Sequence, residues 1–383
     1  MDQLPSPSGR YPVGRVSVDC VDHSRRDIYS NNTADPRRLV LWIWYPAAPE
    51  PSAQPADYLP TPWMPIADYL GIDVAGYRTH AIAGAALAVE EASYPVLMSP
   101  SGFSPLLLAA LAEELASAGY VVVGVNHTYE SAVTVFADGR IVPMNPAALG
   151  GALGPQTGPH DEVFRRRAAV CDYKAADLRS VADHLERLEP SPTGLCRDRL
   201  DLARVGAFGH SFGGNAAMEW CRADARCRAA ANMDGTIWTE VGRVGLARPA
   251  LQLLSEHPEF ALSGDEAVAA GITGDASWHD AEKAITYGGW RAIEHLSPHA
   301  ETVHIAGATH LSFMDIPLLP LGDDSPVRSL LAATHIDPYR MWRLTSDLLL
   351  AFFDRHVNGA KTPPLDALSS QYPELRIGEV LEP

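Results

Sequence analysis

A serine flanked by glycines lies between two segments of different character near the middle of the chain. Residues 205–208 are apolar and typical of a buried strand, and residues 215–222 have the spacing of a helix. Between them, Gly209-His210-Ser211-Phe212-Gly213 has the pattern G-x-S-x-G. In this setting the pattern is typical of a nucleophile elbow, a sharp turn that holds a serine in a strained backbone conformation. Such a turn needs small residues on both sides of the serine, and the two glycines satisfy this need. The simpler alternative is a glycine-rich turn with a solvent-exposed serine that has no catalytic role.

Apolar runs alternate with amphipathic patterns along the whole sequence. Strands are expected at residues 39–45, 94–98, 120–125, 205–208, 229–233, 250–254 and 302–306, and helices at 106–118, 170–188, 215–222 and 339–357. This alternation predicts an α/β fold with a mainly parallel central sheet flanked by helices. Together with the serine motif, it indicates the α/β-hydrolase fold. Because strands recur at sheet-building intervals along the sequence, we expect a single domain over residues 1–383.

Three regions interrupt this alternation. Residues 46–65 contain seven prolines, which excludes regular structure over most of that stretch. Residues 143–159 are rich in glycine and proline and are predicted to form a loop. Residues 255–298 separate two expected strands, and we predict that they form an insertion at the rim of the active site, although such insertions often have no role in function.

The composition excludes some classes of partner. The net charge of −17 argues against a nucleic-acid partner and against binding to anionic membranes, since both need clustered Lys and Arg. No apolar run is long enough to span a bilayer, and we see no secretory signal near the N-terminus. The five cysteines form no C-x-x-C pair. A cytoplasmic protein with reduced thiols is therefore expected, while the oligomeric state cannot be predicted.

A serine hydroxyl needs a histidine to take its proton and an acid to orient that histidine. In the α/β-hydrolase fold these residues follow the order Ser, acid, His. His310 follows the last expected core strand, so we predict that it is the base. For the acid, Asp234 and Glu256 each follow an expected strand, and the residue pattern leaves both open.

Other histidines are weaker candidates for the base. His304 lies within a strand, while His295 and His299 precede it. Pro298 prevents one helix from presenting His295 and His299 as a metal-binding pair, so no metal site is expected there.

An ordered set of short motifs resembles one known family. The matching segments are Tyr11-Pro12-Val13-Gly14, Trp44-Tyr45-Pro46, Trp63-Met64-Pro65, Tyr94-Pro95-Val96-Leu97, Asn126-His127 with Ser131-Ala132, Gly206 to Gly214, Met233-Asp234 and Thr309-His310. On these segments the chain resembles the plasma-type (group VII) platelet-activating-factor acetylhydrolases and their bacterial relatives. The resemblance covers most of the sequence, and it implies an esterase that acts on short acyl esters without a cofactor or metal.

The resemblance also implies roles for individual residues. The family's acid follows the strand after the nucleophile's helix, which selects Asp234. The family's oxyanion hole implies backbone N–H donors at Phe212 and Phe103. The loop before Phe103 has Ser101-Gly102 where the family usually has a His-Gly pair.

The sequence therefore predicts a serine esterase with a Ser211-Asp234-His310 triad and an acyl-enzyme intermediate. Tryptophans Trp63, Trp238 and Trp278 are candidates for the substrate pocket. One alternative is the same triad acting on a thioester, lactone, polyester or amide of a secondary metabolite. An alternative of another class is a non-catalytic binding protein that uses the same scaffold.

Overall fold

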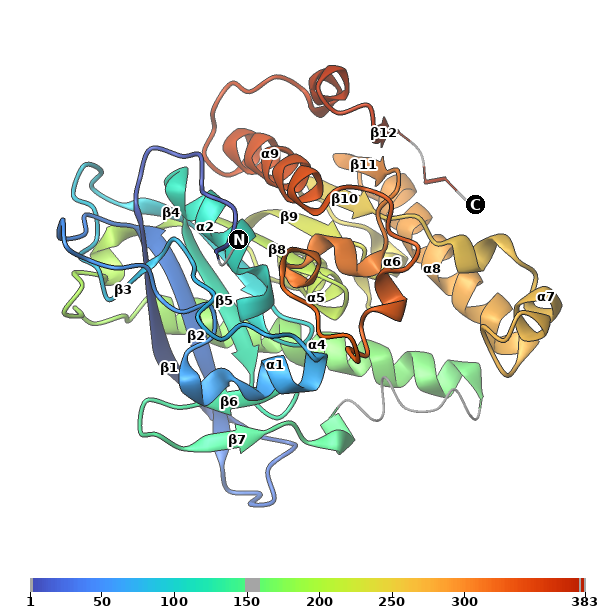
Figure 1. Cartoon of the computed structure of the whole chain (residues 1–383), viewed down its shortest axis with the longest axis horizontal. Coiled ribbons are helices and arrows are strands. Elements are labelled where there is room, and N and C mark those ends of the chain that lie inside the picture. Colours follow the sequence, from blue (N-terminus) through green and yellow to red (C-terminus); the bar gives the residue numbers. More distant parts are fainter. Residues whose placement is uncertain (1–2, 149–158, 379, 382–383) are drawn as a thin grey trace.

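The computed structural model describes residues 3–148, 159–378 and 380–381 (Figure 1). Within these residues a ten-stranded sheet has the order β12-β11-β10-β9-β8-β4-β5-β2-β1-β3. Its strands are β1 (Val13–Arg26), β2 (Pro36–Pro46), β3 (Ile82–Ala83), β4 (Tyr94–Pro100), β5 (Val121–His127), β8 (Leu200–His210), β9 (Cys227–Met233), β10 (Ala250–Leu254), β11 (Ala300–Ile305) and β12 (Leu375–Ile377). A separate hairpin pairs β6 (Val133–Val135) with β7 (Ile141–Pro143).

The centre of the sheet is parallel, as the alternating pattern predicted. Strands β5, β4, β8, β9, β10 and β11 pair in parallel, whereas β2 runs antiparallel to its neighbours β1 and β5. Every residue of β4 and β5 is buried. Near-continuous apolar runs are expected in such strands, because helices cover both of their faces.

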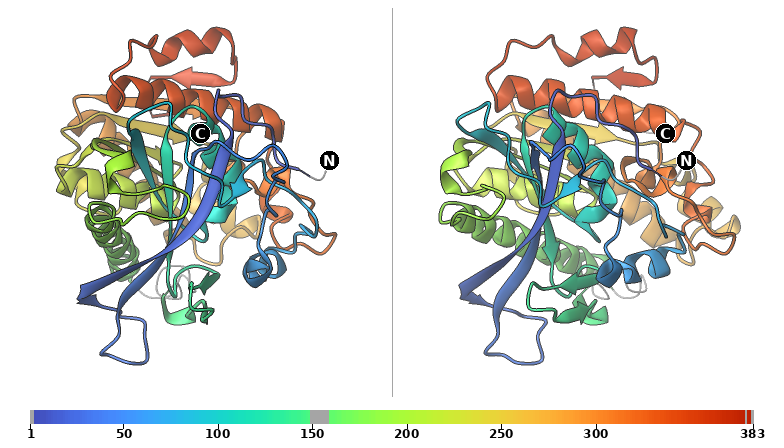
Figure 2. Two further views of the ribbon diagram at one scale, coloured as in Figure 1. Left: turned by 90° about the vertical axis from the view of Figure 1, so that its left-hand side faces the viewer. Right: turned by 60° about the vertical axis from the view of Figure 1, so that its left-hand side comes forward.

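Helices lie on both faces of the sheet (Figures 1 and 2). The α-helices are α1 (Pro65–Leu70), α2 (Ala109–Ser117), α4 (His160–Leu185), α5 (Phe212–Ala223), α6 (Val241–Val244), α7 (Gly264–Ala269), α8 (Ala276–Leu296) and α9 (Pro338–His356). The 3-10 turns are η1 (Thr61–Trp63), η2 (Pro105–Leu108), η3 (Arg197–Arg199), η4 (Pro258–Ala261), η5 (His310–Phe313), η6 (Ile316–Leu318), η7 (Ser329–Leu331) and η8 (Leu365–Ser370).

Two hydrophobic clusters attach these helices to the sheet. Helices α2 and α9 share one cluster with Val122, and α4, α5 and α8 share the other with Val121 and Val123. Successive side chains of a strand point to opposite faces, so β5 contributes to both clusters. Fully burying one such aliphatic side chain stabilises the fold by about 1.5–3 kcal/mol.

The expected strands and helices are all present, with boundaries shifted by a few residues in most cases, except that α4 starts about ten residues earlier than expected. The long strand β1 was not predicted, and neither was the helical content of residues 255–298, which form η4, α7 and α8. Residues 46–65 are mostly irregular apart from η1. The loop predicted at residues 143–159 falls largely outside the described residues.

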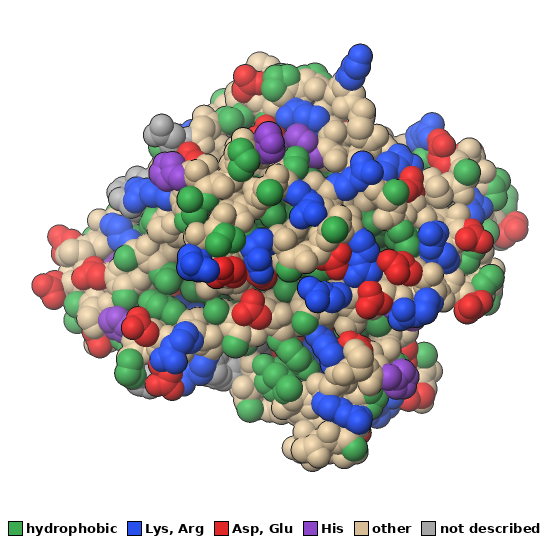
Figure 3. All heavy atoms as spheres, turned by 180° about the vertical axis from the view of Figure 1, so that it is seen from behind, with side chains coloured by type: hydrophobic (Ala, Val, Ile, Leu, Met, Phe, Trp, Pro, Cys, Tyr) green, Lys and Arg blue, Asp and Glu red, His purple; other side chains and the backbone are tan. Residues whose placement is uncertain are grey.

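Acidic and basic side chains are interspersed on the face of the molecule shown in Figure 3. In the described part of the chain, no helix combines the length and the apolar character needed to cross a bilayer.

Candidate active site

Ser211 occupies the sharp turn between β8 and α5. Its backbone lies at φ 59° and ψ −126°, a strained conformation for a residue with a side chain. A Cβ atom on Gly209 would lie 2.4 Å from the carbonyl carbon of Gly213, and one on Gly213 would lie 2.1 Å from the carbonyl oxygen of Pro100. Only glycine fits at these two positions, as the motif predicted. The turn therefore holds the serine hydroxyl at the carboxyl edge of the sheet.

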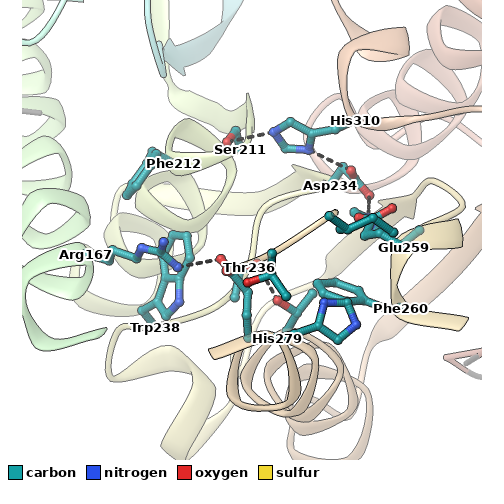
Figure 4. Close-up of a pocket in the computed structure, with 15 residues that line it drawn as sticks. Arg167, Ser211, Phe212, Asp234, Thr236, Trp238, Glu259, Phe260, His279 and His310 are labelled. Atoms are coloured by element: carbon teal, nitrogen blue, oxygen red, sulfur yellow. Dashed lines mark hydrogen bonds and ion pairs between the residues drawn. The ribbon is translucent and has the colours of Figure 1, made fainter. Parts of the chain in front are cut away.

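A chain of hydrogen bonds joins Ser211, His310 and Asp234 (Figure 4). His310 Nε2 lies 3.1 Å from Ser211 Oγ, and His310 Nδ1 lies 2.8 Å from Asp234 Oδ2. An ionised carboxylate only accepts hydrogen bonds, so Nδ1 carries the proton and Nε2 is left to accept one from the serine. Asp234 is 2% exposed, whereas the His310 side chain is 42% exposed. This arrangement can deprotonate the serine during attack on a carbonyl carbon.

Asp234, and not Glu256, contacts His310. Its carboxylate also accepts hydrogen bonds from the backbone N–H of Ser255 (2.8 Å) and the Ser255 hydroxyl (2.8 Å), and lies 3.3 Å from His257 Nε2. Burial opposes ionisation, but the adjacent His257 and the hydrogen bonds from both histidines hold the pKa of Asp234 well below its usual range. Glu256, the alternative left open by the residue pattern, is exposed. Asp234 is thus held ionised beside His310.

His210, the residue before the serine, packs against His310. The two ring centroids are 4.4 Å apart, and His210 Nε2 lies 2.7 Å from the carbonyl oxygen of His310. Burial, with a smaller effect from His310, lowers the pKa of His210 to about 3, so its ring is neutral and donates from Nε2. His210 therefore ties the loop that carries His310 to the elbow.

The other candidate histidines lie away from Ser211. His304 accepts a hydrogen bond from the backbone N–H of Leu381 (2.8 Å), while His295 and His299 are exposed.

The loop after β4 lies beside the elbow, where the predicted oxyanion hole requires it. A Cβ atom on Gly102 would be 3.9 Å from the Cβ of Ser211. Both the backbone N–H and the hydroxyl of Ser101 donate to the carbonyl oxygen of Val125, at 3.3 and 2.9 Å. Ser101 thereby fixes the loop to β5. The predicted donor residues Phe103 and Phe212 immediately follow Gly102 and Ser211.

A cavity of about 400 Å³ opens beside Ser211. It is lined by Arg167, Ser211, Phe212, Asp234, Thr236, Trp238, His257, Glu259, Phe260, Ile272, Thr273, His279, Glu282, Thr286 and His310. About half of these come from residues 255–298, the segment predicted to form the rim. In Figure 4, Arg167 and Trp238 lie on one side of the pocket, and Phe260 and His279 lie on the other. Its volume suits a small-molecule ligand.

Of the three predicted pocket tryptophans, Trp238 lines this cavity. Trp63 instead packs in the core against Trp42, with ring centroids 5.4 Å apart. Trp278 is 2% exposed and packs against His160 and Phe164. The placement of Trp63 and Trp278 differs from the prediction, because each ring finds an aromatic partner outside the pocket.

Several residues that line the pocket were not predicted from the sequence. His257 is the nearest to the reacting groups, because it touches Asp234. Its position just after β10, at the carboxyl edge of a parallel sheet, is the signal that could have found it. Arg167 and Glu282, which both line the pocket, form an ion pair at 2.7 Å. No sequence signal connects these two residues, since they lie on α4 and α8.

One cluster in the described chain has the spacing of a metal site. The ligand atoms of His127, Glu130 and Asp177 lie within 4.8 Å of one another. However, Arg37 contacts Asp177 at 2.6 Å and Glu130 at 2.9 Å, and Lys174 lies 3.6 Å from Glu130. The two cations already neutralise the two carboxylates and would repel a metal ion. The donor set therefore does not fit a metal site.

Comparison with known proteins identifies esterases over nearly the whole chain. No protein-family model matches the sequence. A curated protein of Arthroderma benhamiae, described as a "Probable 1-alkyl-2-acetylglycerophosphocholine esterase", is 26% identical over 97% of this chain and 92% of its own length. The substrate in this description is an acetyl ester of a glycerophosphocholine.

A solved structure agrees with the curated relative. The ferulic acid esterase from Streptomyces cinnamoneus is 30% identical, covers 98% of this chain and 99% of its own, and superimposes with a TM-score of 0.75. The chain therefore belongs to a family of α/β-hydrolase-fold serine esterases of the platelet-activating-factor acetylhydrolase type.

Proposed function

We propose that Ser211 is the nucleophile of this esterase, with His310 as the general base and Asp234 as the residue that orients it. The observation that carries this proposal is the pair of hydrogen bonds of His310, 3.1 Å to Ser211 Oγ and 2.8 Å to Asp234 Oδ2. Together with the strained turn at Ser211, they supply the activated nucleophile that ester cleavage needs.

The reaction has two halves. Ser211 Oγ attacks the ester carbonyl carbon while its proton moves to His310 Nε2, and the N–H groups of Phe103 and Phe212 bind the oxyanion. His310 then gives the proton to the leaving alcohol, and the acyl group stays on Ser211. Water attacks the acyl-enzyme, again with His310 as base, and releases the acid. As the acyl–Ser211 bond breaks, Ser211 Oγ recovers the proton from His310, and the enzyme returns to its starting state.

The expected substrates are short-acyl carboxylic esters, in line with the resemblance to acetylhydrolases and the curated relative. A second candidate is an aromatic acyl ester of the kind named for the Streptomyces enzyme. The pocket favours it specifically, because the rings of Phe212 and Trp238 lie 5.0 Å apart on one wall. Beside them, the hydroxyls of Thr236 and Thr286, 3.0 Å from each other, offer polar partners to a ring substituent.

Hydrolysis of p-nitrophenyl esters from acetate to laurate, together with methyl ferulate, tests the proposal. Ser211→Ala should abolish turnover of every substrate, and EDTA should leave it unchanged. Preference for acetate supports the first substrate class, and preference for ferulate the second. A fully active Ser211→Ala would remove Ser211 as nucleophile. A folded wild type that cleaves no ester and resists a fluorophosphonate probe would favour a binding scaffold.

We also propose that the enzyme works in the cytoplasm. All five cysteines are free thiols, and four of them are buried, as expected in a reducing compartment. Fractionation of the source cells would test this location, and activity recovered outside the cytoplasm would contradict it.

A further inference from the structure

A second histidine contacts the carboxylate that orients His310. His257 Nε2 lies 3.3 Å from Asp234 Oδ1, on the oxygen opposite to the one that His310 contacts. The other ring nitrogen, Nδ1, lies 2.9 Å from Glu259 Oε1. The His257 side chain is 11% exposed. The ring thus lies between two carboxylates, close to the reacting groups.

The hydrogen-bond geometry fixes the charge of this ring. A carboxylate accepts hydrogen bonds and cannot donate them when ionised, so a ring nitrogen facing a carboxylate must carry a proton. Both nitrogens of His257 face carboxylates, which requires the imidazolium form. Burial opposes this charge, but Asp234 and Glu259 raise the pKa of His257 to about 10.

Packing holds the ring in this position. His257 stacks on Phe260, with ring centroids 5.6 Å apart and planes 20° apart, and lies 5.4 Å from the Trp290 ring. The indole N–H of Trp290 donates to the carbonyl oxygen of Gly235 at 2.9 Å, immediately after Asp234. The side chain therefore has little freedom to turn away from Asp234.

We propose that His257 is a positioning residue that fixes Asp234. The ring is held as an imidazolium between Asp234 and Glu259, and its positive charge weakens the electrostatic effect of Asp234 on His310. The inference rests on the proposed role of Asp234 in the triad. A cation beside Asp234 offsets part of its negative charge at His310. The acid limb of the enzyme's activity should therefore lie at lower pH than it would without His257.

Other charged or titratable groups around His257 do not replace this cation. Burial lowers the pKa of His304 to about 4, so His304 is neutral near pH 7. His257 also lines a second cavity, together with Glu256, Tyr287, His304 and Arg376. Among the described residues, His257 is the basic side chain in contact with Asp234 besides His310.

The test is the pH dependence of kcat/KM for a p-nitrophenyl ester. His257→Gln keeps a hydrogen-bond donor near Asp234 but removes the charge, so the midpoint of the acid limb should move to higher pH by about one unit. One pH unit below the wild-type midpoint, activity relative to the plateau should then fall about a further tenfold. His257→Asn, a shorter neutral side chain at the same position, should move the limb in the same direction, and serves as the second variant if His257→Gln does not fold.

His279→Gln is the matched control. His279 lines the same pocket and is 5% exposed, but it contacts the carbonyl oxygen of Leu262 and not Asp234. This variant should keep the wild-type midpoint, whatever it does to KM.

A structural role for His257 would lower the yield or Tm of folded enzyme without moving the midpoint. If His257→Gln and the second variant both fold and both keep the wild-type midpoint, the inference is overturned. This result would leave the proposed function intact, which fails separately if Ser211→Ala remains active. NMR of ring-labelled histidine supplies a readout without turnover. The signal that His257→Gln removes should be doubly protonated at pH 8, and a neutral ring there would contradict the inference.

Discussion

Replacing Gly213 with alanine should damage catalysis through the backbone. The new Cβ would lie 2.1 Å from the carbonyl oxygen of Pro100, where ordinary contacts begin at 3.4 Å. The two backbones would have to separate by 3.4 − 2.1 = 1.3 Å. No side-chain rotation can relieve the clash, because the backbone fixes the position of a Cβ atom and the carbonyl oxygen of Pro100 belongs to the main chain. The displaced loop is the one that leads to Phe103, the proposed oxyanion donor.

The expected loss follows from this displacement. A misplacement of about 1 Å near the reacting atoms can cost about 10²-fold in rate, and the loss of one oxyanion donor costs about 10²–10³-fold. Gly213→Ala should therefore lower kcat/KM for p-nitrophenyl acetate by at least about 10²-fold. Thermal unfolding of the same preparation would separate lost activity from lost fold.

Gly288→Ala is the matched control, since it is the same substitution in a helix. A Cβ on Gly288 of α8 would meet nothing within 4 Å. The change should raise the free energy of unfolding by up to about 1 kcal/mol, from helix propensity alone, and leave kcat/KM unchanged. If Gly213→Ala kept the wild-type kcat/KM, the loop after β4 and the elbow could not be in close contact, and the predicted loss would be refuted.

Asp234→Asn should lower kcat by about 10⁴-fold, since an amide favours the wrong tautomer of His310. Glu256→Gln should keep a kcat near that of the wild type. If steady-state kinetics show the larger loss in Glu256→Gln, the assignment of the acid is wrong. His210→Phe should lower kcat by about tenfold, since it leaves the His310 carbonyl without its donor; unchanged kcat at saturating substrate would refute this role. Burial raises the pKa of Asp315 from 3.8 to about 7, so the folded state binds its proton more tightly than the unfolded state, and stability should fall as pH rises from about 4 to 7. Asp315→Asn should flatten this dependence in denaturant titrations, and an unaltered slope would contradict it.

The central strands and the elbow could be predicted because their signals are local. Strands buried on both faces are near-continuous apolar runs, as in β4 and β5, and their short length and flanking turn residues distinguish them from buried helices. The glycines of the elbow fall within a short motif around Ser211, although the need for Gly213 comes from its contact with Pro100 on another strand. The position of His310 followed from chain order in the fold rather than from its neighbours.

Contacts between distant segments could not be predicted. Asp234 and Glu256 follow adjacent parallel strands, so the sequence places both at one edge of the sheet. Their distinction depends on side-chain direction, set at Asp234 by a left-handed backbone with φ 56°. Trp63 and Trp238 are equally apolar in the sequence, yet only Trp238 lines the pocket. Strand β1 was missed although Val16, Val18 and Cys20 alternate with polar residues, which is the pattern of a strand with one exposed face.

The most direct test of the account is to identify the residue that a fluorophosphonate ester modifies. The purified enzyme would be inactivated with the probe, digested and analysed by mass spectrometry. We expect a single adduct on Ser211 that forms at the rate at which activity is lost. On the same time scale, no adduct should form in the denatured enzyme or in Asp234→Asn. Loss of activity with an adduct on another residue, or full activity with Ser211 modified, would contradict the claim that Ser211 is the nucleophile.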